Sequence, residues 1–458
     1  MKLNPTIFRE YDIRGIAEED FDGAFARALG RAFGSRVVRA RTGGGRPTIA
    51  VGRDYRPTSP GYAAELIAGL REVGVDVLDI GACPTPLLYF ALHELPVDGG
   101  VEVTASHNPS EFNGFKLCLG KQALHGEAIT SLCAEMQGDD FTRGAGTLEE
   151  RDVATPYLAF FREQFGTVPR RLRVVCDAGN GAGGVLGPQV LRALGCEVVE
   201  LYCEPDGTFP NHHPDPTVPE NLVDLIAEVA SRQADLGVAF DGDADRIGVI
   251  APGGRILWGD ELLVIFAREI LARCPGSVVI SEVKCSQRLF DDIVRHGGQA
   301  IMWKAGHSLI KAKMKATGAA VGGEMSGHMF FEDRFFGHDD AIYAAARLID
   351  IVARSGGGVL DLLTGLPESH TTPELRVDCP DDIKFAVVAR VRERLRRDHE
   401  IVDIDGVRVK YEHGWGLVRA SNTQPVLVLR FEATTPEARD DYRARLERVV
   451  AEERAALA

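Results

Sequence analysis

The chain has 458 residues, enough for about three domains at roughly 150 residues each, and each can bury an ordinary core without disulfides. A hydrophobic content of 45% and a charged content of 26% match a folded globular protein and exclude a disordered one. Lys and Arg number 52 against 67 Asp and Glu, and the resulting net charge of −15 excludes the overall basic balance of a nucleic-acid binder.

The first half of the chain alternates helices and strands. Between residues 59 and 74, apolar side chains recur at helical spacing up to Gly74, which is expected to end the helix. A strand over 75–80, a helix over 87–95 and a strand over 101–104 follow, and the last strand runs into the loop 105–109. This alternation is typical of a parallel or mixed sheet covered by helices.

The same pattern restarts twice after residue 150. The second unit is expected to contain strands over 172–176, 197–201 and 236–240 and a helix over 222–230. The third is expected to contain a helix from Asp260, its predicted N-cap, to Ala272, strands over 278–280, 300–303 and 319–321, helices over 286–296 and 307–316, and a helix capped by Asp339 or Asp340 that ends near Ala353.

The pattern changes after the glycine run 356–358. Beyond about residue 368 we expect a helix over 383–397, strands over 401–411, 416–420 and 426–432, and a charged helix over 436–456. The predicted fold class is therefore α/β, with three similar α/β domains that have mixed sheets, plus a C-terminal α+β domain, around a central cleft. The predicted boundaries are 1–152, 153–254, 255–367 and 368–458.

Nine cysteines occur without any C-x-x-C pair, which favours reduced thiols over a disulfide framework or a zinc site. The first residues lack the apolar segment of a signal peptide, and the longest apolar stretch, near 262–267, is too short to span a bilayer. We therefore expect a cytoplasmic protein with no membrane partner. The sequence does not fix the oligomeric state, and a monomer is favoured.

The glycine-rich turn 177–184 follows a predicted strand and opens a helix. Gly179, Gly181 and Gly184 have G-x-G-x-x-G spacing, and Glu200 or Glu204 lies at about the distance of the acidic residue in dinucleotide-binding folds. The turn lacks the Gly-Lys-Ser/Thr of a P-loop, and no paired nucleotide-binding half accompanies it. A helix-capping and packing role is favoured.

Three alternating carboxylates, Asp241, Asp243 and Asp245, follow the strand 236–240. Like charges this close repel unless a cation lies among them, and an oxygen-only set suits Mg²⁺ better than Zn²⁺. A solvated acidic turn is the alternative. An EF-hand is excluded, because Arg246 and Pro252 stand at the sixth and twelfth positions counted from Asp241, where Gly and Glu are required.

Polar loops elsewhere offer other functional groups. Ser106 and His107 follow a strand directly, but the pair alone does not decide between a nucleophile and an ordinary turn. Residues 324–328 place a carboxylate, a hydroxyl and an imidazole where sugar hydroxyls could bind. In the tail, Arg419, Ser421, Asn422 and Thr423 suit a phosphate dianion, with a capped hairpin loop as the alternative.

Taken together, these loops resemble the α-D-phosphohexomutase family in its own order and over nearly the whole chain. The similar segments are the phosphoserine loop 104–109, the metal loop 241–246 with Ala244 in place of the usual Gly, the sugar loop 323–328, the phosphate loop 419–425, and the shorter segments 11–15 and 114–116. Within the family, the closest resemblance is to the bacterial members that act on mannose and glucose phosphates.

The resemblance implies an isomerase that interconverts hexose 1-phosphate and hexose 6-phosphate through a phosphoserine and a 1,6-bisphosphosugar. Ser106 would carry the phosphoryl group and, with Asp241, Asp243 and Asp245, hold Mg²⁺. Glucose or mannose 1,6-bisphosphate would serve as primer and intermediate. The partner would be a phosphosugar.

The resemblance also implies roles for other residues. Arg14 and Arg246 would stabilise charge at the phosphoserine. Lys116, with His107 nearby, is the first choice to handle the proton of the attacking hydroxyl, and His328 is the second. The remaining substrate contacts are Tyr11, Lys284, His307, Glu324, Ser326, His328, Arg419, Ser421, Asn422 and Thr423.

Three alternative functions remain. A phosphoglucosamine mutase usually has Gln where this chain has Met325, and Ser-Ala-Ser where it has Thr104-Ala105-Ser106, so both positions favour glucose and mannose. A metal-dependent sugar-phosphate phosphatase would need a water-filled site. A sugar-phosphate binder without enzymatic activity would need no phosphate on Ser106.

Overall fold

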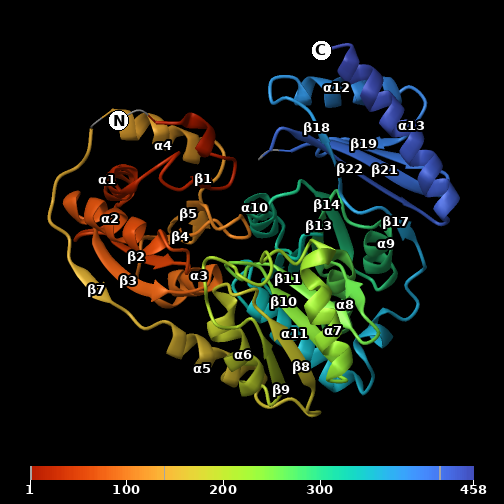
Figure 1. Ribbon diagram of the computed structural model, residues 1–458, viewed down its shortest axis with the longest axis horizontal. Helices are drawn as coiled ribbons and strands as arrows, with labels where there is room; N and C mark the ends of the chain where they lie inside the picture. Colours follow the sequence, from red (N-terminus) through yellow and green to blue (C-terminus); the bar gives the residue numbers. More distant parts are fainter. Residues whose placement is uncertain (1–2, 139, 422–423, 458) are drawn as a thin grey trace.

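The computed structural model describes residues 3–138, 140–421 and 424–457. These residues form four sheets that follow one another along the chain, each with its own helices. In Figure 1 the first unit lies at the left and the last at the upper right, and the second and third pack together below them. The three expected α/β units and the α+β tail are confirmed.

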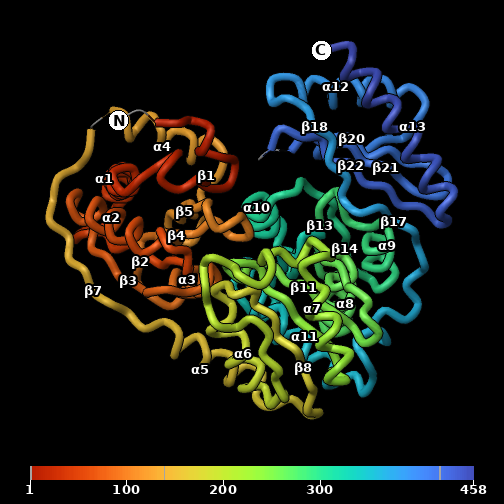
Figure 2. Tube along the Cα trace, viewed as in Figure 1, coloured from red at the N-terminus to blue at the C-terminus, as the bar shows by residue number. Residues whose placement is uncertain are grey.

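The first unit has a mixed sheet of strand order β1-β5-β4-β2-β3-β7, with β6 beside β5. Strands β2, β3, β4 and β7 run parallel, and β5 is antiparallel to both β1 and β4. Its elements are η1 (Pro5–Ile7), β1 (Ile13–Ile16), α1 (Gly23–Ala40), β2 (Thr48–Arg53), α2 (Ser59–Glu72), β3 (Asp76–Ala82), α3 (Thr85–Glu94), β4 (Gly99–Val103), β5 (Phe112–Leu119), β6 (Gln122–Ala123), α4 (Glu127–Gln137) and β7 (Leu148–Glu150). Figure 2 shows the chain leaving this unit along its outer edge towards the second.

The second unit has the order β12-β11-β10-β8-β9, with a parallel part around β8. The turn 177–184 packs tightly, because a Cβ on Gly184 would lie 2.0 Å from the carbonyl oxygen of Cys203, so its packing role is confirmed. The elements are α5 (Ala154–Phe165), β8 (Arg173–Asp177), α6 (Gly183–Ala193), β9 (Glu197–Leu201), η2 (Pro219–Leu222), α7 (Val223–Ser231), β10 (Leu236–Phe240), β11 (Ile247–Ala251) and β12 (Arg255–Leu257).

The third unit has the order β14-β13-β15-β16. Asp340 caps α11 as predicted, with its Oδ1 accepting from the Tyr343 N–H at 2.8 Å. The predicted Asp260 cap is wrong: Trp258 is the N-cap of α8, and the Asp260 carboxylate accepts instead from the Glu261 and Ser286 N–H groups. The elements are α8 (Gly259–Arg273), β13 (Val278–Glu282), α9 (Gln287–Arg295), β14 (Gln299–Trp303), α10 (His307–Thr317), β15 (Val321–Gly323), β16 (Met329–Phe331), α11 (Ala341–Ser355) and η3 (Val359–Leu363).

The fourth unit is an antiparallel sheet of order β17-β22-β21-β20-β19, with β18 also on β22, covered by two helices. The single strand predicted over 401–411 is wrong: it is two strands, because Gly406 takes a φ of +81° in a turn between them. The elements are β17 (His370–Thr371), β18 (Leu375–Asp378), α12 (Lys384–Leu395), β19 (Ile401–Val402), β20 (Val407–Tyr411), β21 (Gly414–Ala420), β22 (Val426–Ala433) and α13 (Pro436–Ala455).

The apolar cores divide the molecule unevenly. One continuous cluster joins α3 of the first unit to the second and third units, whereas the rest of the first unit and the fourth unit each have a cluster of their own. A small group of Val283, Trp415 and Leu417 links the fourth unit to the third. Over the described part of the chain, no helix combines the length and apolar character needed to cross a membrane.

Candidate active site

Ser106 lies in the loop after β4 and is 2% exposed. Its φ of +51° is in the left-handed region, which residues other than glycine rarely adopt. The Ser106 N–H donates to Thr104 Oγ1 at 2.9 Å. The Ser106 Oγ donates to Asp241 Oδ2 at 2.8 Å and lies 3.1 Å from His107 Nδ1. The backbone of this loop therefore points the hydroxyl at the carboxylate loop of the second unit.

The carboxylate loop follows β10 and contains Asp241, Asp243 and Asp245, all fully buried. The Asp241 Oδ1 accepts from the N–H groups of Asp245 and Arg246, both at 3.0 Å, which closes the loop on itself. A Cβ on Gly242 would lie 2.3 Å from the carbonyl oxygen of Ser106, so only glycine lets the two loops come this close.

Lys116 extends from β5 into the same group. Its Nζ donates to Asp243 Oδ2 at 2.6 Å and to Asp245 Oδ2 at 2.5 Å. Burial lowers the pKa of Lys116, but the two carboxylates outweigh burial, so the net shift is upward and the side chain is an ammonium. Thr85 Oγ1 from α3 also donates to Asp243 Oδ2, at 2.5 Å.

The geometry fits a hard divalent cation such as Mg²⁺. Within the described chain, the Oδ1 atoms of Asp243 and Asp245 are buried and have no hydrogen-bond partner. One oxygen from each of the three carboxylates lies within 4.8 Å of the others. Burial, then Asp245 and Asp243, raise the pKa of Asp241, so a bound cation would favour its ionised form. Oxygen-only donors are the ligands that Mg²⁺ prefers.

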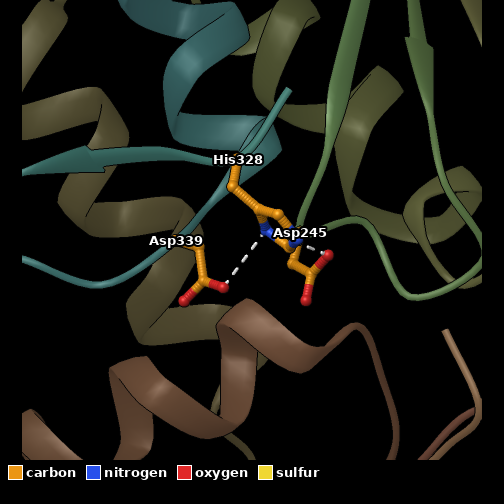
Figure 3. A group of neighbouring side chains, drawn as sticks. All are labelled: Asp245, His328 and Asp339. Carbon is orange, nitrogen blue, oxygen red and sulfur yellow. Dashed lines mark ion pairs between the residues drawn. The ribbon is translucent and has the colours of Figure 1, made fainter. Parts of the chain in front are cut away.

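His328 is oriented by three neighbours. Arg246 Nε donates to His328 Nε2 at 3.0 Å, so Nδ1 carries the proton of the neutral ring. The Nδ1 lies 3.5 Å from Asp245 Oδ1 and 3.3 Å from Asp339 Oδ2 (Figure 3). Lys311 Nζ holds the other oxygen of Asp339 at 2.7 Å. The ring therefore has a fixed tautomer.

Arg14 reaches the serine loop from β1. Its Nη1 donates to Asn108 Oδ1 at 2.7 Å, and it also pairs with Asp12. This contact places a cation beside the Ser106 loop. His107 adds no charge there, because burial, followed by Arg246 and Arg14, lowers its pKa well below its usual range.

A second group of predicted residues lies where the first and third units meet. Tyr11 Oη donates to the carbonyl oxygen of Ala305 at 2.9 Å. Glu324 Oε1 accepts from the Gly306 N–H at 2.7 Å. The His307 ring stacks on His328, with centroids 5.6 Å apart, so this group adjoins the first one.

The fourth unit joins this group through Asp405. Its Oδ2 accepts from Arg419 Nε and from the Ala305 N–H, both at 3.0 Å. Lys284 lies at the same boundary, with its Nζ 3.2 Å from Glu374 Oε2 and 3.7 Å from Glu282 Oε1.

Two further predicted residues, Ser326 and Ser421, lie in loops. Ser326 is half-buried between β15 and β16. Ser421 Oγ accepts from the Gln424 N–H at 3.2 Å. The predicted phosphate contacts Asn422 and Thr423 lie outside the described residues.

The structure thus connects predicted site residues from all four units. The connections pass from Ser106 to Asp241 and Asp245, then through His328 and His307 to Ala305 and Asp405. Sequence reasoning missed Asp405 and Glu282, and named Asp339 only as a possible helix cap. A cavity of about 570 Å³ lies elsewhere, under the linker 364–371, and none of the predicted site residues lines it.

Comparisons with known proteins agree across the chain. Residues 5–143, 155–254 and 258–370 match "Phosphoglucomutase/phosphomannomutase, alpha/beta/alpha domain" I, II and III, and residues 374–449 match the C-terminal domain of that family.

Individual relatives match over nearly their full length. A phosphomannomutase/phosphoglucomutase of Pseudomonas aeruginosa is 47% identical over 440 residues, covering 95% of this chain and 93% of the relative. A phosphoglucomutase of Neisseria gonorrhoeae is 43% identical over 449 residues, covering 97% of this chain and 96% of the relative. The crystal structure of a phosphoglucomutase/phosphomannomutase family protein from Burkholderia thailandensis superposes with a TM-score of 0.93 at 43% identity, covering 99% of this chain and 98% of that chain.

Proposed function

The chain belongs to the phosphoglucomutase/phosphomannomutase family, and we propose that it interconverts hexose 1-phosphate and hexose 6-phosphate, with glucose or mannose as the sugar. Ser106 carries the phosphoryl group, and a 1,6-bisphosphosugar is the intermediate. The observation that carries the proposal is the 2.8 Å contact of Ser106 Oγ with Asp241, beside two buried carboxylate oxygens that have no hydrogen-bond partner in the described chain.

Each half-reaction moves one phosphoryl group. The bond between Ser106 Oγ and phosphorus breaks as a sugar hydroxyl oxygen bonds to phosphorus, and the electron pair stays on Ser106 Oγ. The hydroxyl proton passes to a base. The bisphosphosugar then turns over, and its other phosphoryl group returns to Ser106. Such transfers need mainly positioning and charge stabilisation from the protein.

His328 is the better proton acceptor of the two candidates in this arrangement. Its Nε2 has a lone pair, which accepts from Arg246 here and becomes free when Arg246 turns to phosphate oxygens. Lys116 is an ammonium between two carboxylates and has no free lone pair, so its role is to offset charge. A positioned base contributes typically about 10²–10⁴-fold in rate.

Asp241, Asp243, Asp245 and the oxygens on Ser106 would hold Mg²⁺. When bound, Mg²⁺ supplies charge neutralisation to the transferring phosphoryl group. Arg14 supplies further positive charge at the serine loop.

The other end of the substrate would bind across the third and fourth units. Lys284, Arg419 and Ser421, with Asn422 and Thr423, form the phosphate site, in which arginine provides a bidentate donor set. Glu324 and Ser326 hold sugar hydroxyls, and Tyr11 and His307 line the approach between them. One phosphate site can therefore hold either end of the sugar, which a mutase of this kind requires.

Activity measurements on the purified chain test the proposal. Glucose 1-phosphate and mannose 1-phosphate, with Mg²⁺ and the matching 1,6-bisphosphate, should give 6-phosphates, and Ser106→Ala should lower kcat by roughly 10⁴-fold or more. Full activity of Ser106→Ala would contradict the proposal. Release of inorganic phosphate instead of product would indicate a phosphatase, and conversion of glucosamine 1-phosphate alone would indicate a phosphoglucosamine mutase.

A further inference from the structure

One buried side chain, Arg56, holds the loop that carries Ser106. Arg56 lies after β2 and is 1% exposed, and a guanidinium has five N–H donors. All five have acceptors: Nε donates to Asp54 Oδ2 at 3.1 Å, Nη2 to the carbonyl oxygens of Ser106 at 2.8 Å and Asn108 at 2.6 Å, and Nη1 to those of Pro109 at 2.5 Å and Phe112 at 2.9 Å. Three of the five contacts are therefore to the loop after β4, and a fourth is to the first residue of β5.

The loop needs such support because of its backbone. Ser106 has a φ of +51°, a conformation that persists only where the surroundings fix it. The carbonyl oxygen of Ser106 is itself one of the Arg56 acceptors, so the guanidinium fixes the peptide plane next to the reacting hydroxyl. The same carbonyl is where Gly242 of the carboxylate loop makes its close approach.

Arg56 is anchored in turn. Asp54 Oδ1 accepts from the Arg56 N–H at 3.0 Å and from Ser59 Oγ at 2.5 Å, and the Asp54 carboxylate balances the guanidinium charge. The centroid of the Phe209 ring, from the second unit, lies 5.1 Å from the guanidinium carbon. Arg56 thus lies at the contact between the unit that provides the serine and the unit that provides the carboxylates.

We propose that Arg56 is a positioning residue for phosphoryl transfer, which holds Ser106 Oγ in register with Asp241, Asp243 and Asp245. The inference rests on the proposed function, since it assigns Arg56 to the serine that carries the phosphoryl group. The fork of the guanidinium is essential to it. A lysine keeps the charge but has three donors on one nitrogen, which cannot span four carbonyl oxygens.

Kinetics of Arg56→Lys, with Arg347→Lys as the control, test the proposal. Arg347 is equally buried and donates to Asp333 and Glu269, away from the predicted site residues. We expect Arg56→Lys to lower kcat about 10–100-fold, because a small displacement of a reacting group greatly slows the chemical step. The KM for glucose 1-phosphate should change less than about threefold. The control should lose thermal stability but keep its kcat. Equal kcat in the two variants would overturn the proposal.

Two measurements separate loop positioning from loss of folding. Methylguanidinium should restore part of the kcat of Arg56→Ala, whereas methylammonium should not, and Arg347→Ala should respond to neither. Hydrogen exchange of the unphosphorylated chain should speed up on the order of tenfold at residues 104–113 in Arg56→Lys. Unchanged exchange there would overturn the inference even if Ser106 is phosphorylated. Faster exchange in an enzyme that carries no phosphate would support the role of Arg56 and defeat the proposed function.

Discussion

The two ends of the active site are built differently. The end with Ser106 and the three aspartates lies on the first and second units, which are joined by the apolar cluster around α3, and its loops come into close backbone contact at Gly242. The end with Arg419 lies on the fourth unit, which has a separate core. The fourth unit contacts the third through the small apolar group of Val283, Trp415 and Leu417. Arg408 and Arg430 add hydrogen bonds to the carbonyl oxygens of Val283, Lys284 and Cys285.

This difference has a mechanistic meaning. Phosphoryl transfer depends on positions fixed to a fraction of an ångström, and a shared core resists deformation. A unit with its own core and only a small apolar contact to its neighbour can move as a body. We infer that the serine end is preorganised for chemistry, whereas the fourth unit adjusts to hold the phosphate at either end of a sugar that must turn over.

A substitution at the serine end should have the largest effect on activity. Asp243→Asn removes a buried carboxylate whose Oδ1 is available to a cation and whose Oδ2 accepts from Lys116. We expect kcat to fall about 10²–10³-fold, as for loss of a group that stabilises transition-state charge. The Mg²⁺ concentration for half-maximal activity should rise, with KM for glucose 1-phosphate nearly unchanged.

The control for that variant is Asp292→Asn. Asp292 is also buried and bonds to Arg268, outside the site. Its kcat and Mg²⁺ dependence should stay normal. If Asp243→Asn changed KM alone, the serine end would be a binding site and not the place of chemistry.

A substitution at the phosphate end should have a smaller effect, on KM instead of kcat. Asp405→Asn weakens the contacts that Oδ2 makes with Arg419 and with the Ala305 N–H. We expect KM to rise about 3–10-fold, in line with the loss of one charge-assisted hydrogen bond, and kcat to change little. Steady-state kinetics with glucose 1-phosphate measure both. A large fall in kcat at constant KM would contradict the division between the two ends.

Lowering the pH should reduce the stability of the contact between the first and third units. His93 on α3 stacks on Phe336, with centroids 4.5 Å apart, and burial, then Lys121, lowers its pKa to about 4. Because the unfolded side chain has a pKa near about 6.5, the unfolded state binds more protons between these values, and stability falls as pH drops from 6.5 to 4.

His93→Phe should therefore reduce this pH dependence modestly. Urea unfolding at several pH values measures the free energy of unfolding, with His413→Phe as an exposed control. If the free energy of unfolding of His93→Phe depended on pH as it does in the wild type, protonation of His93 would not contribute to the acid sensitivity of the contact between α3 and Phe336.

The sequence predicted the loops well because each is a local pattern. The triple carboxylate at 241–245 and the serine at a strand end need only a few consecutive residues to be recognised, and the structure places them together. Most elements followed from apolar spacing in the same way. Helix α1 was not predicted, although Phe25, Leu29, Phe33 and Val37 lie on one face at helical spacing.

Pairing between distant segments could not be read from the sequence. Lys116 and Asp243 are 127 positions apart, and no local pattern joins them. Arg56 looks like a surface charge in sequence, because its carbonyl acceptors lie some fifty positions further along the chain. Asp405 lies in a turn that the predicted strand 401–411 had covered. In each case the missing information was which backbone groups the fold brings to the side chain.

One measurement tests the central claim most directly. The wild-type chain is first phosphorylated with glucose 1,6-bisphosphate and separated from the sugar. It is then mixed with glucose 1-phosphate for a single turnover. Mass spectrometry follows the mass of the chain and of its tryptic peptides. The account predicts a phosphoryl group on the peptide that contains Ser106, which decreases while glucose 1,6-bisphosphate is present and returns as glucose 6-phosphate forms. An active enzyme that never carries phosphate on Ser106, or one that releases it as inorganic phosphate, would contradict the account.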